Sequence, residues 1–589
     1  IGFDQFPTSA TYGTGLNAAS TGDGLASMLL NLPSNLFGFV GYTGADDKTN
    51  WQGYYLQDKW QASKKLNIQI GIRYDYVPPA RYKNDQVSGW NPECPVPAER
   101  YPAGSDGANQ LINSCFLIPI PFSTPVATSW PFPNVRKTFF DPKFNGWQPR
   151  FGFAYSATPK TVVRGAFTIF TDHNNTLVQE SQDPRIAWPW GAGVSYGSLN
   201  RGLVSDNNCQ SANTNNGQLV GPYSILTKLS QACWSNLPAA GLFLPPNNYT
   251  PALAFGATPR LKIPYAMQFN FSVEREIKPN LTATVGYVGS QSRHLFIQPM
   301  YNAPLPNLMG PGDVAPRTPF PFFGQFPWDT NSGVGSYNSL QVKVQKRYSQ
   351  GLTFLASYTW SKCLSIQDEG QSGSIQNPYN WSADKGNCDF NIPHLFVFSY
   401  GYELPVGKGK YFGNNMSGVG NAILGGWQIS GITTAESGSP LNVGVGFDNA
   451  NINPSSETQR ANPVPGVPLL PAGFHQGPEH WYNPAAFTVP PPYTFGVLGR
   501  NTLRGPKYLN FDFALMKNFK VTESKSFQFR SEFFNIFNNV NFSPPGGGAS
   551  GGFSTLGGAV TTSVSDPNFM KIFSAAAARE IQFSLKFLW

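Results

Sequence analysis

The sequence lacks any long apolar run and is poor in charged residues. No stretch reaches the roughly 18 consecutive apolar residues that a spanning helix needs, and mean hydropathy is slightly negative, at −0.26. Charged residues make up 13% of the chain, about half of the roughly 25% usual in soluble domains. This composition argues against a helical membrane bundle and fits a soluble globule poorly.

Motifs for catalysis and metal binding are also lacking. The chain has five histidines, and none is paired with a carboxylate or a cysteine at a metal-ligand spacing. There is no nucleophile elbow and no phosphate-binding loop. The net charge is +8, but the basic residues are scattered rather than clustered. We therefore expect no enzymatic activity, no cofactor, no bound metal and no nucleic-acid partner.

Alternating apolar and polar residues recur along the chain, and aromatic residues reach 14%. The segment "KLNIQIGIRYDY" (65–76) alternates in this way, as do "AMQFNFSVE" (266–274) and the tail "IQFSLKFLW" (581–589). Because successive side chains of a strand point to opposite faces, a period of two over roughly 10 residues is typical of a membrane-spanning strand.

The alternating segments come in pairs that are joined by short turns and separated by long connections. We predict about thirteen strands, at 51–62, 65–77, 147–156, 161–172, 264–276, 281–292, 336–348, 352–362, 392–404, 424–436, 508–519, 525–537 and 579–589, with a fourteenth candidate near 36–43. Turns are expected near Lys64, Pro159, Pro279, Gln350 and Ser524, all at one rim. Short turns on one side and long loops on the other predict an all-β, antiparallel transmembrane β-barrel with long extracellular loops.

The six cysteines fall in twos within, or at the edge of, single predicted loops. Six cysteines allow 15 connectivities, but cysteines that share a loop are close in space. We therefore predict three disulfides in an oxidising compartment: Cys94–Cys115, Cys209–Cys233 and Cys363–Cys388.

Charged residues at the polar positions of the predicted strands form a second set of candidates. They are expected to face the barrel lumen, where they bind water, one another, a plug or a solute. They are Arg73, Asp75, Arg164, Glu274, Lys343, Asp512, Arg530 and Glu532.

Several segments taken together resemble the barrel of Oar-like TonB-dependent outer-membrane receptors, which are abundant in acidobacteria and myxobacteria. Those segments include "NWQGYYLQDKWQASKKLNIQIGIRYDY", "YAMQFNFSVEREIKPNLTATVGYVGSQSRHLF", "DFNIPHLFVFSYGYELPVGKGK", "GGWQISGITTAESGSPL" and "FRSEFFNIFNNVNF". The resemblance runs in order from about residue 25 to Trp589. It implies a bacterial outer-membrane location and the import of a solute.

The family implies a barrel of about 22 strands, filled by a plug, with a TonB box and often a small β-sandwich at the N-terminus. None of these three parts is visible in residues 1–589. The whole chain is therefore expected to be a partial barrel, a C-terminal segment with an incomplete, C-shaped sheet. TonB would act only through the missing N-terminal part.

The tail strand is expected to place its apolar residues against lipid and Gln582, Ser584 and Lys586 inside. The resemblance implies that the closing aromatic residue belongs to a signal read by the barrel-assembly machinery. The apolar residues of this candidate signal are Ile581, Phe583, Leu585, Phe587 and Trp589.

Three functions remain open at this point. The favoured one is a receptor-transporter barrel that binds an unidentified solute in its outer loops. The second is a structural or adhesive outer-membrane barrel that imports nothing. The third is a secreted, soluble all-β protein, which would need a regular repeat that the chain lacks.

Overall fold

The computed structural model describes most of the chain outside its longest loops. The described residues are 47–79, 140–172, 260–321, 325–368, 375–452, 459–520, 525–544 and 567–589, the short pieces 35–41, 81–82, 89–90, 95–101, 116–117, 191–197, 214–215, 218–219, 256–258 and 562–564, and the single residues 105, 107 and 522.

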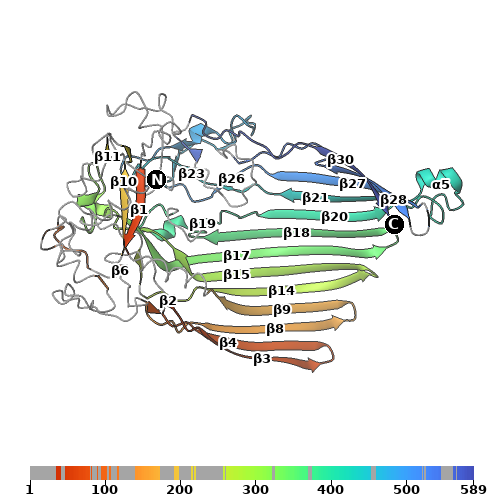
Figure 1. The fold of residues 1–589 in the computed structure, drawn as a ribbon, viewed down its shortest axis with the longest axis horizontal. Helices are drawn as coiled ribbons and strands as arrows, with labels where there is room; N and C mark the ends of the chain where they lie inside the picture. The colour runs from red at the N-terminus through yellow and green to blue at the C-terminus, as the bar shows by residue number, and fades with distance from the viewer. Residues whose placement is uncertain are drawn as a thin grey trace.

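One large sheet dominates the described part of the chain (Figure 1). Its strands follow one another in sequence order and pair antiparallel along the main path. They are β3 (Gln52–Ser63), β4 (Leu66–Tyr76), β8 (Trp147–Thr158), β9 (Thr161–Thr171), β14 (Tyr265–Lys278), β15 (Leu281–Ile297), β17 (Phe326–Ser349), β18 (Leu352–Ser365), β20 (His394–Glu403), β21 (Trp427–Glu436), β27 (Tyr508–Lys520), β28 (Ser526–Phe534) and β30 (Glu580–Leu588). All the strands predicted between residues 51 and 589 are confirmed.

The remaining elements are short. The other strands are β1 (Asn35–Gly41), β2 (Asp47–Lys48), β5 (Arg81–Tyr82), β6 (Gly89–Trp90), β7 (Phe116–Leu117), β10 (Gly191–Gly197), β11 (Thr214–Asn215), β12 (Gln218–Leu219), β13 (Gly256–Ala257), β16 (Met300–Tyr301), β19 (Gly386–Asn387), β22 (Pro440–Leu441), β23 (Val443–Gly444), β24 (Asn462–Pro463), β25 (Phe487–Thr488), β26 (Leu503–Arg504) and β29 (Thr562–Ser563). The helices are α5 (Gly418–Leu424) and the 3-10 turns η4 (Pro306–Leu308), η5 (Ala315–Arg317), η6 (Trp381–Asp384) and η8 (Pro484–Ala486).

The two ends of the large sheet differ, as the sequence predicts. The connections after β3, β8, β14, β17 and β27 are short and lie together at the right-hand end in Figure 1, which we call the turn rim. The described parts of the long connections lie at the opposite end, which we call the loop rim. The single rim predicted for the short turns is therefore confirmed, although Ser524 itself lies outside the described residues.

The turn between β17 and β18 illustrates how the sequence closes a hairpin. Gln350 and Gly351 have positive φ values of 54° and 77°, which a type I′ turn requires at both central residues. Glycine has no Cβ and adopts this conformation without steric cost. The twist of such a turn matches that of the paired strands, so the chain reverses within two residues.

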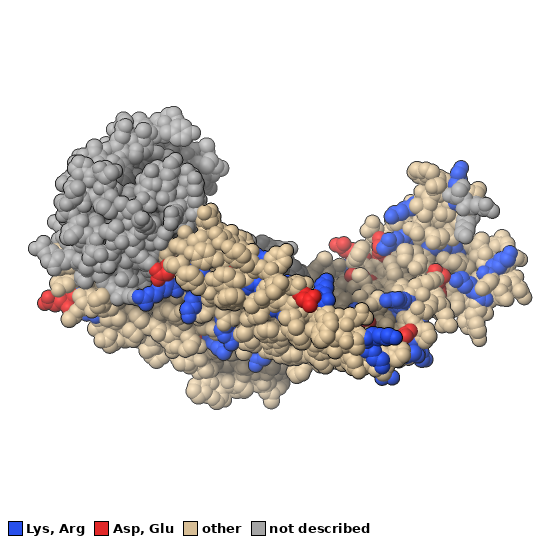
Figure 2. Space-filling view, turned by 90° about the horizontal axis from the view of Figure 1, so that it is seen from below, with Lys and Arg blue, Asp and Glu red and all other residues tan. Residues whose placement is uncertain are grey.

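The sheet is open along its path. Among the described residues, β3 pairs only with β4 and β30 pairs only with β28. Figure 2 shows that the molecule is bowed, with a hollow on one side. The expected incomplete sheet is therefore confirmed.

Two expectations about strands need correction. A strand does form near 36–43, but β1 pairs with β10 in a separate two-stranded sheet and adds nothing to the large one. In addition, β17 starts at Phe326, ten residues before its predicted start at 336. This extension pairs with β16 and β13 at the loop rim, and these non-local pairings leave no local sequence pattern.

Candidate functional site

The strand register gives the large sheet one apolar face. Residues directly opposite each other in a ladder point to the same side, so this face can be followed from strand to strand. It carries Trp60, Ile68, Phe153, Phe271, Tyr287, Leu340, Trp360, Phe396, Phe513, Phe533 and Ile581. Many of these side chains are exposed; Trp60 is 59% exposed and Phe271 50%. An apolar surface of this extent is unfavourable in water and stable in hydrocarbon.

The opposite face is polar, and the register places all eight charged strand candidates on it. Arg164 and Glu274 lie on adjacent strands and form an ion pair at 3.0 Å. Arg530 and Glu532 pair at 2.7 Å along one strand. The Oδ1 atom of Asp512 accepts hydrogen bonds from Asn510 and from the Asn535 backbone.

Near the loop rim, this polar face is covered. Asp75 is 2% exposed, pairs with Arg73 at 2.8 Å and accepts a hydrogen bond from the amide of Gln148 on β8. Its backbone N–H donates to the Gly146 carbonyl at 2.9 Å. A buried carboxylate needs such partners, because its desolvation would otherwise be costly. Lys343 lies farther from this end, between Thr284 and Ser357.

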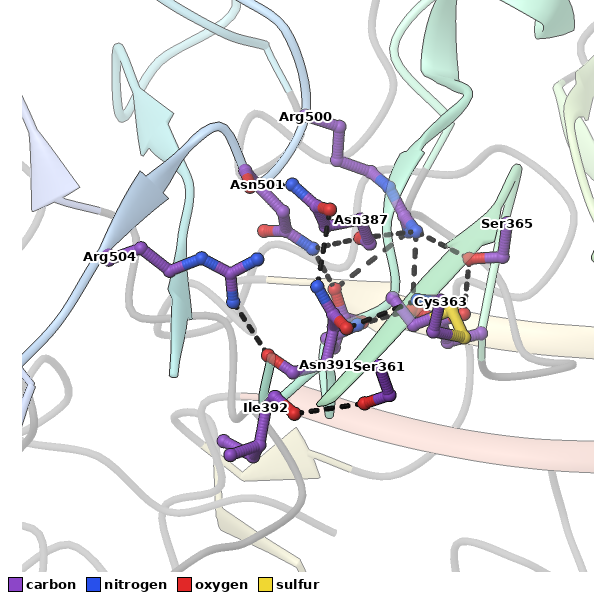
Figure 3. Close-up of a disulfide and its surroundings, with 12 residues drawn as sticks. Ser361, Cys363, Ser365, Asn387, Asn391, Ile392, Arg500, Asn501 and Arg504 are labelled. Carbon is purple, nitrogen blue, oxygen red and sulfur yellow. Dashed lines mark hydrogen bonds and ion pairs between the residues drawn. A yellow bond between two sulfur atoms is a disulfide. The ribbon is translucent and has the colours of Figure 1, made fainter. Parts of the chain in front are cut away.

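The described parts of the loops after β18 and β21 fold together around one disulfide, and we call this unit the loop cluster (residues 366–368, 375–393, 437–452 and 459–507). Cys363 at the end of β18 is bonded to Cys388, with a Cα–Cα distance of 5.4 Å. Figure 3 shows Arg500 reaching across to this bridge from the second loop. Its guanidinium donates to Ser365 at 2.7 Å and pairs with Asp368 at 3.2 Å. The predicted Cys363–Cys388 bond is thus confirmed, and it sits where two loops meet.

A second buried ion pair joins the same two loops. Arg460 and Asp384 are 3% and 0% exposed, and the Arg460 guanidinium donates to the Asp384 carboxylate. Gln376 of the first loop also bonds to the second loop. Its side chain accepts a hydrogen bond from the Arg460 backbone N–H at 2.7 Å and donates one to the Gly496 carbonyl at 2.9 Å. Buried charges persist only when they are paired and hydrogen-bonded, so this contact fixes the two loops against each other.

The loop cluster contains a hydrophobic core, to which the short segment 569–570 contributes two further residues. The residues are Leu441, Val443, Val445, Ala461, Tyr482, Ala486, Phe487, Leu503, Phe569 and Met570. Phe487 packs edge to face on Phe569 with ring centroids 5.6 Å apart. The loop rim therefore contains a packed core of the kind found in globular proteins.

Burial also shifts the pKa values of two titratable groups at the loop rim. It lowers the pKa of Lys143 to about 7, because removal from water disfavours the charged ammonium. The Lys143 side chain is 3% exposed and lies 5.6 Å from the centre of the Phe140 ring. Burial raises the pKa of Tyr379, whose hydroxyl donates to the Ala303 carbonyl at 2.5 Å.

The tail strand β30 lies at one edge of the sheet. Phe587 faces Phe527 of β28, and the ring centroids are 5.0 Å apart. The register places Ile581, Phe583, Leu585 and Phe587 on the apolar face and Gln582, Ser584 and Lys586 on the polar face. Trp589 follows the strand and is 87% exposed.

Some predicted sites cannot be followed, and some residues of the loop cluster carry no signal in the sequence. Cys94, Cys115, Cys209 and Cys233 lie outside the described residues, so their two disulfides stay predictions. Sequence reasoning missed the Arg460–Asp384 pair and Arg500, because residues in irregular loops have no periodicity that would pair them. The one sequence clue to the role of Ser365 is its position two residues after Cys363, which belongs to a predicted disulfide.

No cluster of three or more His, Cys, Asp or Glu side chains suited to a metal occurs among the residues described. Within the same part of the chain, no helix has the length and apolar character required to cross a membrane.

Comparisons with known proteins place the fold. A family model described as outer membrane beta barrel domain matches residues 2–582. Similar solved structures include the ferric-catecholate import receptor Fiu from K12 E. coli, at 10% identity with a TM-score of 0.36; the match covers 92% of this chain and 45% of the receptor. For the ferripyoverdine receptor of the Pseudomonas aeruginosa outer membrane, identity is 8%, the TM-score is 0.37, and the match covers 92% of this chain and 39% of the receptor.

The chain therefore spans less than half of the length of the solved structures that it resembles, between 39% and 48%. A search of curated proteins finds no match. The family match covers nearly the whole chain and agrees with the antiparallel sheet and its exposed apolar face. This protein belongs to the outer membrane beta barrel domain family and is a transmembrane β-barrel protein of the bacterial outer membrane.

Proposed function

We propose that this chain forms part of the barrel wall of an Oar-like, TonB-dependent receptor that binds a solute at the loop rim and imports it. The loop cluster is the observation on which this proposal depends. Two buried ion pairs and a disulfide hold the cluster at the end of the polar face. A preorganised outer surface loses little conformational entropy when a ligand binds, and a polar wall beneath it provides a hydrated route.

In this proposal the apolar face contacts lipid and the polar face borders the lumen. The eight charged candidates then line the interior, where Arg164–Glu274 and Arg530–Glu532 keep their charges paired and hydrated. In the same proposal, residues 1–589 form a segment of the barrel. The role is binding and transport rather than catalysis.

The cysteine pairs that lie outside the described residues belong to the same proposal. Cys94–Cys115 and Cys209–Cys233 would stiffen two further outer loops in the way that Cys363–Cys388 joins the loop cluster. The tail, with its apolar residues on one face and Trp589 at its end, would be read by the barrel-assembly machinery.

The test measures binding and import separately, in cells that produce the whole receptor of which this chain forms the barrel wall, and in matched cells without TonB. The probes are labelled peptides, glycans and ferric or cupric chelates. We expect one probe class to bind in both strains and to accumulate inside only where TonB is present. Binding without accumulation in either strain would instead indicate an adhesive barrel, and absence of binding would contradict both functions.

A matched pair of variants locates the site. Asp384→Asn disrupts the buried pair of the loop cluster, and we expect it to weaken probe binding. Arg164→Gln removes an exposed pair of the polar face and leaves binding unchanged. Equal effects of both variants would mean that the loop cluster is not the binding surface.

A further inference from the structure

The connection between β20 and β21 stands apart from every other described connection at the turn rim. It spans residues 404–426, whereas β14–β15 and β17–β18 are joined by two-residue turns. It contains α5, which projects beyond the strand ends at the right of Figure 1. The connection is folded on itself: the Gly407 N–H donates to the Phe412 carbonyl at 2.9 Å, and the Lys408 N–H donates to the Asn421 amide oxygen at 2.7 Å.

The end of α5 is tied to the apolar face of the sheet. The Ile423 carbonyl accepts hydrogen bonds from the Trp427 indole at 2.9 Å and from the Lys517 ammonium at 2.7 Å. The register places Trp427 and Lys517 opposite each other on the apolar face. The Lys517 ammonium lies 4.9 Å from the Trp427 ring centroid and 5.0 Å from that of Phe519. The connection thus continues the apolar face past the ends of the strands.

The surface of this connection is apolar to an unusual degree. Tyr411 is 85% exposed and Val419 73%. Val419 and Ile423 are four residues apart in α5 and therefore share one side of the helix. Phe412 and Leu424 are also more than half exposed. Nothing in the described chain covers these side chains, so we call them the rim patch (Tyr411, Phe412, Val419, Ile423 and Leu424).

Two lysines lie in the same connection as the rim patch. Residues 404–426 contain Lys408 and Lys410 and no acidic residue. Both lysines are exposed, and Lys410 pairs with Glu403 at the end of β20. Figure 2 shows Lys and Arg side chains, with some Asp and Glu among them, toward the end of the molecule that corresponds to the turn rim. Exposed apolar side chains beside lysines are the composition that favours insertion into an anionic lipid interface.

We infer that the rim patch docks into the headgroup layer of the phospholipid leaflet at the turn rim. Its apolar side chains reach the upper acyl chains, and Lys408 and Lys410 contact anionic phosphates. Lipid is the occupant because the patch is continuous, through Trp427 and Lys517, with the face that already borders lipid. A soluble partner would have to bind within the same headgroup layer. The segment would fix the depth at which this side of the barrel sits in the membrane.

Spin labels in outer membranes that contain the whole protein test this inference. Val419→Cys and Ile423→Cys carry the label, Val285→Cys on the apolar face is the lipid reference, and Val497→Cys in a loop, 75% exposed, is the water reference. Collisions with oxygen, which concentrates in lipid, are compared with collisions with a water-soluble nickel chelate. We expect the oxygen-to-nickel ratio at 419 and 423 to exceed that at 497 several-fold and to approach that at 285.

Two results would overturn the inference. Ratios at 419 and 423 equal to that at 497 would place the patch in water. Low accessibility to both reagents would mean that a protein covers it instead. The double variant Lys408→Gln, Lys410→Gln tests the contribution of the lysines. The oxygen-to-nickel ratio at 423 should fall in this variant, and an unchanged ratio would show that the two lysines do not bind anionic phosphates.

Discussion

The loop rim and the strand wall of this protein bury their apolar side chains in opposite ways. At the loop rim, Phe487 is 5% exposed and Met570 is fully buried, packed within one cluster. On the wall, Phe271 is 50% exposed and Phe583 67%. The same residue types are therefore buried by protein in one region and left for lipid in the other. The two regions therefore suit different environments. The loops bury their apolar side chains against each other, as a water-soluble protein does, whereas the wall needs surrounding hydrocarbon to cover its apolar side chains.

Charges follow the same division. The ion pairs of the loop cluster are almost fully buried, whereas Arg164 and Glu274 on the polar face are 47% and 39% exposed. An exposed pair contributes little, because water and salt screen it. A buried pair matters chiefly when one partner is lost, since the other is then left charged without compensation. Substitutions in the two regions should therefore have very different effects.

The largest effect is expected from Asp384→Asn in the loop cluster. The variant leaves Arg460 buried without its carboxylate, which should destabilise the cluster by about 3–5 kcal/mol. The measurement is the rate of limited proteolysis in the loops, compared with unfolding of the whole barrel in urea. Arg164→Gln is the control and should change stability by less than about 1 kcal/mol. If both variants lower stability by similar amounts, the buried and exposed ion pairs do not differ in the way described.

A charge placed on the wall probes the hydrocarbon side of the comparison. Val285→Lys puts an ammonium on the apolar face well within β15 and should cost about 2–4 kcal/mol near the bilayer midplane. Thr284→Lys is the adjacent control; it points to the polar face and should cost far less. Urea titration of folded protein in lipid vesicles gives both values. If Thr284→Lys proves the more costly, the faces have been assigned the wrong way round.

Removing the disulfide sharpens the comparison within the loop rim. Cys363→Ser together with Cys388→Ser opens a covalent loop whose ends are 25 residues apart, and closure of such a loop is worth about 3 kcal/mol. The loss should appear as faster proteolysis of residues 366–393, while the circular dichroism of the strands is retained. Collapse of the strand signal would show that the wall depends on the loop cluster for its folding.

The smallest effect concerns pH and Lys143. Its pKa is lowered to about 7 in the folded protein, below the ordinary value of about 10.4. Between these values the unfolded chain binds more protons, so stability should rise with pH, by roughly 1 kcal/mol between pH 7 and pH 8. Lys143→Met should abolish this slope in urea titrations at a series of pH values. A slope unchanged in the variant would assign the dependence to other groups.

The strands and their two faces could be predicted from the sequence because both follow from local alternation. "AMQFNFSVE" becomes the middle of β14, and Phe269 and Phe271 lie on the apolar face, as a period of two requires. The short turns could also be predicted from the sequence, since residues such as Gly351 permit the tight reversal that a two-residue hairpin needs. The Cys363–Cys388 bond followed from two cysteines sharing one loop.

The loop cluster and the rim patch were not predictable in this way. Arg460 meets Asp384 across 76 residues, and Arg500 meets Ser365 across 135. The Ile423 carbonyl of α5 accepts a hydrogen bond from Lys517, which is 94 residues away. Irregular segments have no period, so their partners depend on how two loops fold against each other. The sequence by itself determined the alternating wall, because each strand's pattern is local. Only the tertiary structure decided which loop residues meet, because those contacts join segments that are far apart in the sequence.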